Sequence, residues 1–165
     1  MSRFVFSVFA DYFQFYLQDD AAPLDEVNFA EAWTEEAFER QLAATPCAIA
    51  IGTSRNMTVP VVLEIEASPP EDDPTAELVT EASFDVKSGR LAILGCTDYG
   101  PDAPRIDVLP GRYHARVFYY DQERLSDDAL EGDDRYRLVL WPDAAVITPR
   151  ILVDRRQLLP SQRAR

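Results

Sequence analysis

His114 is the only histidine in the chain, and it stands between Arg112 and Arg116 in an alternating stretch. A histidine can act as a general base or a metal ligand, but a metal site needs further histidines or a thiol cluster, and the sequence shows no such pattern. Neither a G-x-S-x-G turn nor another local signature marks a serine or cysteine nucleophile. We therefore predict no catalytic residue, no metal site and no cofactor, with His114 on the surface of its strand.

Carboxylates are concentrated in segments 67–77 and 121–134. Clusters of this kind are typical of solvated turns. The stretch SDDALEGDD in the second segment supplies oxygen ligands and a glycine, but it lacks the D-x-D-x-D-G register of a calcium loop. We predict solvated turns in both segments and keep calcium binding as an alternative.

The charge of the chain restricts its partners. The 165 residues have a formal net charge of −13 and a pI near 4.4. Such a charge repels phosphate backbones and anionic lipid head groups, so we expect no direct binding to nucleic acid and no membrane association. The complementary expectation is a basic protein partner, although the charge could also serve solubility alone. The sequence leaves the oligomeric state open.

Cysteine usage and hydropathy indicate a cytoplasmic location. Cys47 and Cys96 both lie beside apolar residues, which predicts two buried, reduced thiols. The apolar run near the start of the chain is interrupted at Asp11, so we expect no secretory segment. No stretch approaches the roughly 20 apolar residues that a membrane-spanning helix needs.

Alternation of apolar and polar residues dominates the chain and predicts β-strands. In residues 12–18, Phe13, Phe15 and Leu17 should face the core, while the residues between them face outward. Small residues in 47–52 indicate a further strand that lies beneath bulkier side chains. The remaining strands are predicted at 58–67, 78–86, 90–96, 110–120 and 135–141.

One segment has helical spacing instead. Apolar residues recur on one face at Trp33, Ala37, Phe38 and Leu42. Thr34 can cap the first amides of a helix, and Pro46 follows the end of the pattern, which predicts a helix over 34–44. Strands with turn-rich connections and one short helix predict a mainly β fold, an antiparallel β-sandwich of about eight strands.

A single domain over 1–148 is expected, because no linker or internal repeat divides the sequence. Residues 149–165 form an arginine-rich C-terminal tail with five arginines and one aspartate, and the body without them has a formal charge of −17. A frayed tail is the prediction for this segment.

Two surfaces remain as candidates for binding a partner. The first is the outward face of the opening strand with the two aspartates that follow it, a polar-aromatic ladder of the kind enriched in recognition surfaces. The alternative is that another strand or the helix packs over this face. The second is the short connection GTSRNMTVP between two strands. The alternative here is that Asn56 only supplies a turn conformation and that Arg55 pairs with one of the many carboxylates of the chain. The candidate residues are Tyr12, Gln14, Tyr16, Gln18, Asp19, Asp20, Arg55 and Asn56.

The chain resembles the competence protein J family, bacterial β-rich proteins whose named member inhibits a DNA-entry nuclease. The matching elements are, in order, DYFQFYLQD, WTEEAFE, CAIAIGTSRN with Arg55 and Asn56 at its end, and DVLPGRYHARV with Pro110, Gly111 and Tyr113. This chain is longer, with added acidic segments. The resemblance implies a β-rich fold and a nuclease-inhibiting role, and it assigns no inhibitory residue.

These observations lead to two main hypotheses. The first is an acidic, non-enzymatic binding protein that masks a basic nuclease or toxin as an inhibitor or immunity-type protein. The second is a small-molecule or carbohydrate-binding β-sandwich that uses Tyr12, Gln14 and Tyr16 as a stacking platform, with calcium in an acidic loop. An enzyme comes third and would require a deep pocket in which His114 meets a carboxylate and a hydroxyl or thiol.

Overall fold

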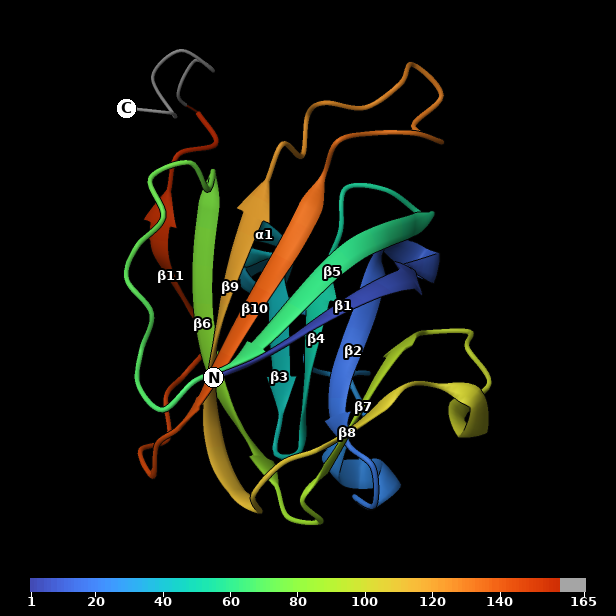
Figure 1. The fold of residues 1–165 in the computed structure, drawn as a ribbon. Coiled ribbons are helices and arrows are strands. Elements are labelled where there is room, and N and C mark those ends of the chain that lie inside the picture. The colour runs from blue at the N-terminus through green and yellow to red at the C-terminus, as the bar shows by residue number, and fades with distance from the viewer. Residues whose placement is uncertain (158–165) are drawn as a thin grey trace.

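Two β-sheets pack face to face in the computed structural model, which describes residues 1–157 (Figure 1). The six-stranded sheet has the order β1 (Ser2–Phe9), β5 (Thr58–Ile65), β10 (Arg135–Pro142), β9 (Gly111–Tyr120), β6 (Leu78–Val86) and β11 (Arg150–Asp154). The five-stranded sheet has the order β3 (Leu42–Thr45), β4 (Ala48–Gly52), β2 (Gln14–Asp19), β7 (Arg90–Gly95) and β8 (Arg105–Asp107). The predicted β-sandwich is confirmed, with eleven strands in the described residues rather than about eight.

One ladder departs from the predicted antiparallel arrangement. β10 runs parallel to β5, with Tyr136 opposite Val61 and Leu140 opposite Ile65. The other ladders between named strands are antiparallel. Period-two alternation is the same in both arrangements, so the sequence does not distinguish them. β10 thereby joins the β1–β5 pair to strands β9, β6 and β11.

The core lies between the sheets and begins with the aromatic strand β2. Phe15 and Leu17 are buried, as predicted, whereas Phe13 is 52% exposed. Tyr12 and Phe13 both have left-handed backbone angles, with φ of 58° and 60°, in the 3-10 turn η1 (Asp11–Phe13). β2 therefore begins only at Gln14, and the alternation predicted from residue 12 onward is wrong for its first two residues.

The predicted helix is present but shorter. Thr34 caps α1 (Glu35–Arg40) by accepting a hydrogen bond from the Ala37 amide at 3.2 Å, as the sequence indicated. Gln41 then adopts a left-handed conformation with φ of 56°, which ends the helix. The last predicted helical residues belong instead to β3, because pairing with β4 buries Leu42 in the core.

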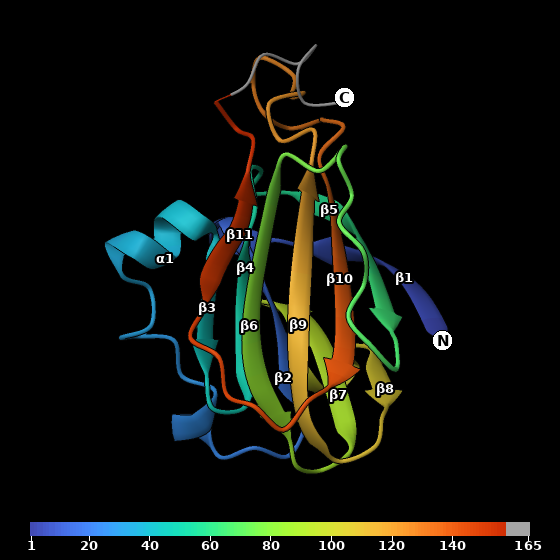
Figure 2. The same cartoon turned by 90° about the vertical axis from the view of Figure 1, so that its left-hand side faces the viewer.

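The outer face of the six-stranded sheet is also apolar and covered. Its buried cluster includes Val79, Phe118, Tyr120, Val139 and Trp141. His114 shares this face and is 6% exposed, so its predicted surface position is wrong. The Ala145 carbonyl lies 2.7 Å from His114 Nε2, and the Arg116 guanidinium donates to the Pro70 carbonyl at 2.7 Å. Segment 67–77, predicted as solvated turns, thus runs along this face (Figure 2).

The first part of the predicted tail belongs to the sheet. β11 pairs antiparallel with β6, and Arg150 contacts Glu81 at 3.4 Å. Arg155 donates to the Ala76 carbonyl at 2.8 Å. The remainder of the tail, 158–165, lies outside the described residues. Residues 150–154 are therefore an edge strand rather than a frayed end.

The two cysteines differ in burial. Cys47 is buried, as predicted, and its Sγ donates a hydrogen bond to Glu26 Oε2 at 3.2 Å. Cys96 is exposed, contrary to the prediction, because β7 ends at Gly95. Both are free thiols.

Candidate protein-binding site

The outer face of β2 carries the ladder predicted from the sequence, partly covered by the chain that leads from β2 to α1. Gln14, Tyr16 and Gln18 are half-buried. Tyr16 stacks on Phe29 with ring centroids 5.1 Å apart, and the Trp33 indole N–H donates to Gln14 Oε1 at 2.9 Å. A hollow of about 400 Å³ remains between the ladder and this covering segment. The ladder is therefore only partly open to a partner.

The two aspartates after the ladder are engaged within the chain. Asp19 is buried and accepts hydrogen bonds from the Ser88 hydroxyl and from the backbone amides of Ala21, Lys87 and Ser88. Burial alone would raise the pKa of Asp19, but these hydrogen bonds outweigh it and lower the pKa below its ordinary value. Asp20 pairs with Arg105 at 3.0 Å. Asp19 thus supports the turn before β7 instead of facing a partner.

Aromatic side chains project from η1 and α1. Tyr12 is 68% exposed and Phe38 66% exposed. Phe38 stacks on Trp33 with ring centroids 5.1 Å apart and an interplanar angle of 26°. The backbone of η1 is held by the Thr53 amide, which donates to the Phe13 carbonyl at 2.9 Å. Left-handed aromatic residues are uncommon, and strained positions of this kind cluster at functional sites.

These aromatic residues line a groove of about 780 Å³, which we refer to as the aromatic groove. Its other walls come from the β4–β5 connection, the start of the β9–β10 loop and the end of β11. The residues that line it are Tyr12, Phe13, Gln14, Trp33, Phe38, Glu39, Gln41, Gly52, Thr53, Ser54, Glu77, Gln122, Glu123, Asp154, Arg156 and Gln157.

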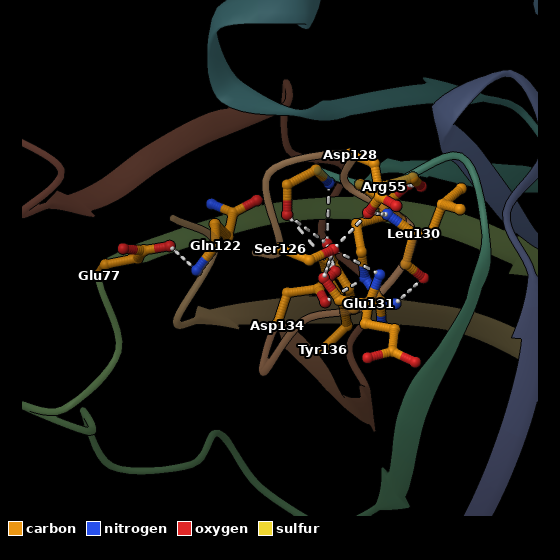
Figure 3. Close-up of polar contacts among 11 residues, drawn as sticks. Arg55, Glu77, Gln122, Ser126, Asp128, Leu130, Glu131, Asp134 and Tyr136 are labelled. Atoms are coloured by element: carbon orange, nitrogen blue, oxygen red, sulfur yellow. Dashed lines mark hydrogen bonds and ion pairs between the residues drawn. The ribbon is translucent and has the colours of Figure 1, made fainter. Parts of the chain in front are cut away.

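Arg55 is buried, whereas a surface position was predicted for it as a partner-binding candidate. Its Nε lies 2.6 Å from Asp134 Oδ1, and its Nη1 donates to the Leu130 carbonyl at 3.1 Å (Figure 3). The Tyr136 hydroxyl donates to the second oxygen of Asp134 at 2.8 Å. Of the two candidate residues in this connection, only Asn56 is exposed. Arg55 is therefore a positioning residue for the loop that contains Leu130 and Asp134.

That loop, residues 121–134, is an ordered acidic hairpin. The Ser126 amide donates to the Glu131 carbonyl and the Asp133 amide to the Arg124 carbonyl, each at 2.8 Å. The Ser126 hydroxyl donates to Asp128 at 2.7 Å (Figure 3). The hairpin contains seven carboxylates and one arginine and extends beyond the sheets (Figure 1). Most of its carboxylates are exposed, as expected for a solvated turn, whereas Asp134 is buried.

The aromatic groove is negatively charged, like the acidic hairpin. Its described lining residues include four carboxylates and a single guanidinium, that of Arg156. Arg156 pairs with Asp154 at 2.9 Å, and hydrogen bonds from Arg156 hold the pKa of Asp154 below its ordinary value. At the base of the groove, the Gln41 amide donates to the Gln122 carbonyl oxygen at 2.6 Å. A ligand entering the groove meets aromatic faces and a negative field.

His114 lies on the covered outer face of the six-stranded sheet, where its ring packs edge-on against Trp141. Its Nδ1 lies 3.8 Å from both Glu81 and Asp143, and the side chain is not part of the lining of either hollow described above. Within residues 1–157, no group of three histidine, cysteine or carboxylate side chains is arranged to hold a metal ion. The one α-helix of this region is too short to cross a membrane.

Solved structures reveal what this arrangement is similar to. ComJ from Bacillus subtilis, an inhibitor of the DNA-degrading activity of NucA, superposes with a TM-score of 0.62 at 20% identity, over 87% of this chain and 96% of ComJ. The chain has the ComJ fold. The protein of crocagin biosynthetic gene J superposes with a TM-score of 0.55 at 18% identity, over 87% of this chain and 99% of its own. No protein-family model and no curated sequence matches.

The resemblance inferred from the sequence is confirmed at the level of the fold. Of the candidate residues, the structure brings Tyr12 and Gln14 to the aromatic groove, while Tyr16 and Gln18 line the smaller hollow. Sequence reasoning missed Phe13 and Phe38 because it assigned both to the core. A helix of only six residues gives Phe38 little to pack against, and that shortness was not visible from the spacing.

Proposed function

We propose that this protein binds a basic protein, a nuclease or a toxin, and inhibits it without catalysing a reaction. The observation that carries the proposal is that exposed aromatic residues and the acidic hairpin meet at one groove, where Tyr12 and Phe38 lie with Glu123 of the hairpin. ComJ, which has the same fold, inhibits a nuclease, and this supports the proposal.

The physical logic rests on the partner's own function. A nuclease cleft must be positive to hold phosphates, so an ordered row of carboxylates can occupy it in place of nucleic acid. Complementary fields of this kind raise association rates by roughly 10- to 1000-fold at low salt. Partly exposed aromatic side chains then supply the desolvated contacts that slow dissociation. The hairpin would raise the association rate, and the aromatic groove would lower the dissociation rate.

The direct test combines capture with inhibition. The tagged protein is incubated with purified NucA, and DNA degradation is followed at rising salt. We expect inhibition that weakens steeply with salt, because exposed charges are screened beyond a Debye length of about 10 Å at 0.1 M. A pull-down from the source cell at low and high salt extends the search to other nucleases and toxins. Recovery of no basic protein in either condition, together with unchanged NucA activity, would refute the proposal.

A matched pair of variants locates the charge that acts. Asp127→Lys with Glu131→Lys reverses two exposed hairpin charges, and neither carboxylate accepts a hydrogen bond within residues 1–157. Asp102→Lys with Asp107→Lys makes the same charge change beside β8. The hairpin variant should lose inhibition at least about tenfold more than the control, which corresponds to about 1.4 kcal/mol. Equal losses would mean that only net charge matters.

The aromatic groove also favours a second candidate, a small-molecule or carbohydrate-binding module. Its volume falls within the range of about 300 to 1,000 Å³ that is usual for ligand pockets. A thermal-shift screen with sugars, with and without calcium, tests this candidate. A true ligand at about 100 times its dissociation constant should add roughly 2.7 kcal/mol of stability.

A further inference from the structure

We propose that the aromatic groove receives a short arginine-containing segment that projects from the partner protein. This inference rests on the proposed function and names the chemistry that its groove would recognise. Its volume, about 780 Å³, gives room for several residues of chain rather than a single small ion.

The aromatic walls favour a cation. The faces of tyrosine, phenylalanine and tryptophan rings carry a negative quadrupole, and a guanidinium lying over such a face gains about 0.5 to 1 kcal/mol even at exposed sites. Tyr12 and the stacked pair Trp33–Phe38 present such rings at the groove. Phe13, from the strained turn η1, lies among the lining residues beside Tyr12.

The charge of the groove excludes the opposite ligand class. Four carboxylates and one guanidinium among the described lining residues would repel a phosphate. A neutral sugar would gain no electrostatic attraction from this negative field. The amides of Gln41 and Gln122 are hydrogen-bonded to one another at 2.6 and 3.1 Å. Gln14 is likewise engaged by the Trp33 indole. Asp154 is paired with Arg156 and Glu77 accepts from the Gln122 backbone amide, so the groove offers ring faces and a net negative field rather than a set of unpaired polar groups.

Arginine fits these groups better than lysine. Its guanidinium is planar, stacks on rings and binds carboxylates through two parallel hydrogen bonds, whereas an ammonium is a strongly hydrated point charge. The chain itself already uses this contact three times on the outer face of the six-stranded sheet. The guanidinium carbons lie 3.9 Å from the Tyr120 ring centroid for Arg135, 4.8 Å from Phe118 for Arg137 and 5.2 Å from Trp141 for Arg116.

The indole N–H groups of the two tryptophans allow a direct NMR test. Trp33 lines the groove, whereas Trp141 is buried in the outer cluster and serves as an internal control. The peptide acetyl-Gly-Arg-Gly-Arg-Gly-amide is titrated against the labelled full chain, followed by versions with lysine or with citrulline, which keeps the shape of arginine without its charge. We expect a saturable shift of the Trp33 indole with the arginine peptide, with Trp141 unchanged. The lysine peptide should bind more weakly, and the citrulline peptide at least about tenfold more weakly, or 1.4 kcal/mol.

Variants then assign the contact to the rings. Phe38→Ala should weaken the arginine peptide about two- to fivefold, the equivalent of losing a cation–π contact of 0.5 to 1 kcal/mol. Tyr99→Ala removes a side chain that is 69% exposed but lies outside the groove, and it should change nothing. The spectra themselves report whether each variant is folded.

Three results would overturn the inference. Equal binding of the citrulline peptide would show that the groove does not recognise the positive charge. Shifts confined to the acidic hairpin would place the bound cation outside the groove. Absence of any saturable shift would mean that the groove does not bind this segment. None of these depends on the whole partner. If NucA were inhibited while the peptides failed, only the groove assignment would be wrong and the proposed function would stand.

Discussion

Replacing Arg55 by alanine should lower the free energy of unfolding by about 3 to 5 kcal/mol, because removing one partner leaves the other charge buried without compensation. Asp134 is completely buried and Arg55 almost so, with 2.6 Å between Nε and Oδ1. After the substitution, the Asp134 carboxylate keeps the Tyr136 hydroxyl at 2.8 Å and the Ser54 hydroxyl at 3.4 Å. The Leu130 carbonyl also loses its donor, so the acidic hairpin loses both of its contacts with Arg55 and is left with the Ser54–Asp134 hydrogen bond to the β4–β5 connection.

Urea unfolding followed by tryptophan fluorescence measures this loss, and a double-mutant cycle with Asp134→Asn isolates the pair. The double variant should cost less than the two single changes together, with a coupling of about 1 to 3 kcal/mol. Arg90→Ala is the matched control: its guanidinium lies 3.9 Å from Asp107, the two side chains are 55% and 95% exposed, and little change is expected. A loss below about 1 kcal/mol for Arg55→Ala, or simple additivity in the cycle, would refute the positioning role.

Three further predictions follow from single groups. Tyr12→Gly should keep the free energy of unfolding within about 1 kcal/mol of wild type in urea, because relief of left-handed strain offsets the added chain entropy, while capture of the partner weakens. The lowered pKa of Asp19, held by Ser88 and backbone amides against burial, contributes stability that is present above its unfolded value of about 4 and is lost as the pH falls through its folded value. Asp19→Asn should therefore destabilise the protein at about pH 7 and much less at about pH 3, and equal losses at both would contradict this. Burial raises the pKa of Cys47 to about 12, so a thiol reagent at about pH 8 should modify the exposed Cys96 first and reach Cys47 only after denaturation.

The fold class could be predicted because the residues that a strand or helix buries recur at the period of that element. Phe15 and Leu17 are buried, and Thr34 caps α1, as their spacing indicated. The parallel pairing of β10 with β5 could not be seen, because it depends on which distant strands meet. Four edge strands were not predicted: β1, and the short strands β3, β8 and β11, whose three to five residues carry too little periodicity.

The site was harder to predict than the fold because function departs from local rules there. Tyr12 was expected to extend a strand, yet the left-handed turn η1 turns it and Phe13 outward. Arg55 was a candidate surface contact, with pairing to a carboxylate as the alternative. Its buried partner Asp134 could not be identified, because it lies 79 positions away in the sequence. The segment 67–77 and the acidic hairpin are largely exposed, as expected for solvated turns, but their contacts with Arg116 and Arg55 arise only from tertiary packing.

The position of β10 determines how this chain can be assembled. It is the strand that closes the gap between β5 and β9, and it is synthesised after both of them. Until it is inserted, those two strands have open edges, which are ready templates for pairing with other chains. Because β10 joins β5 to β9 and is distant in sequence from β5, folding should be slow for a protein of this size and completed only after β10 has been synthesised. The nascent protein would therefore be most vulnerable to aggregation just before β10 emerges.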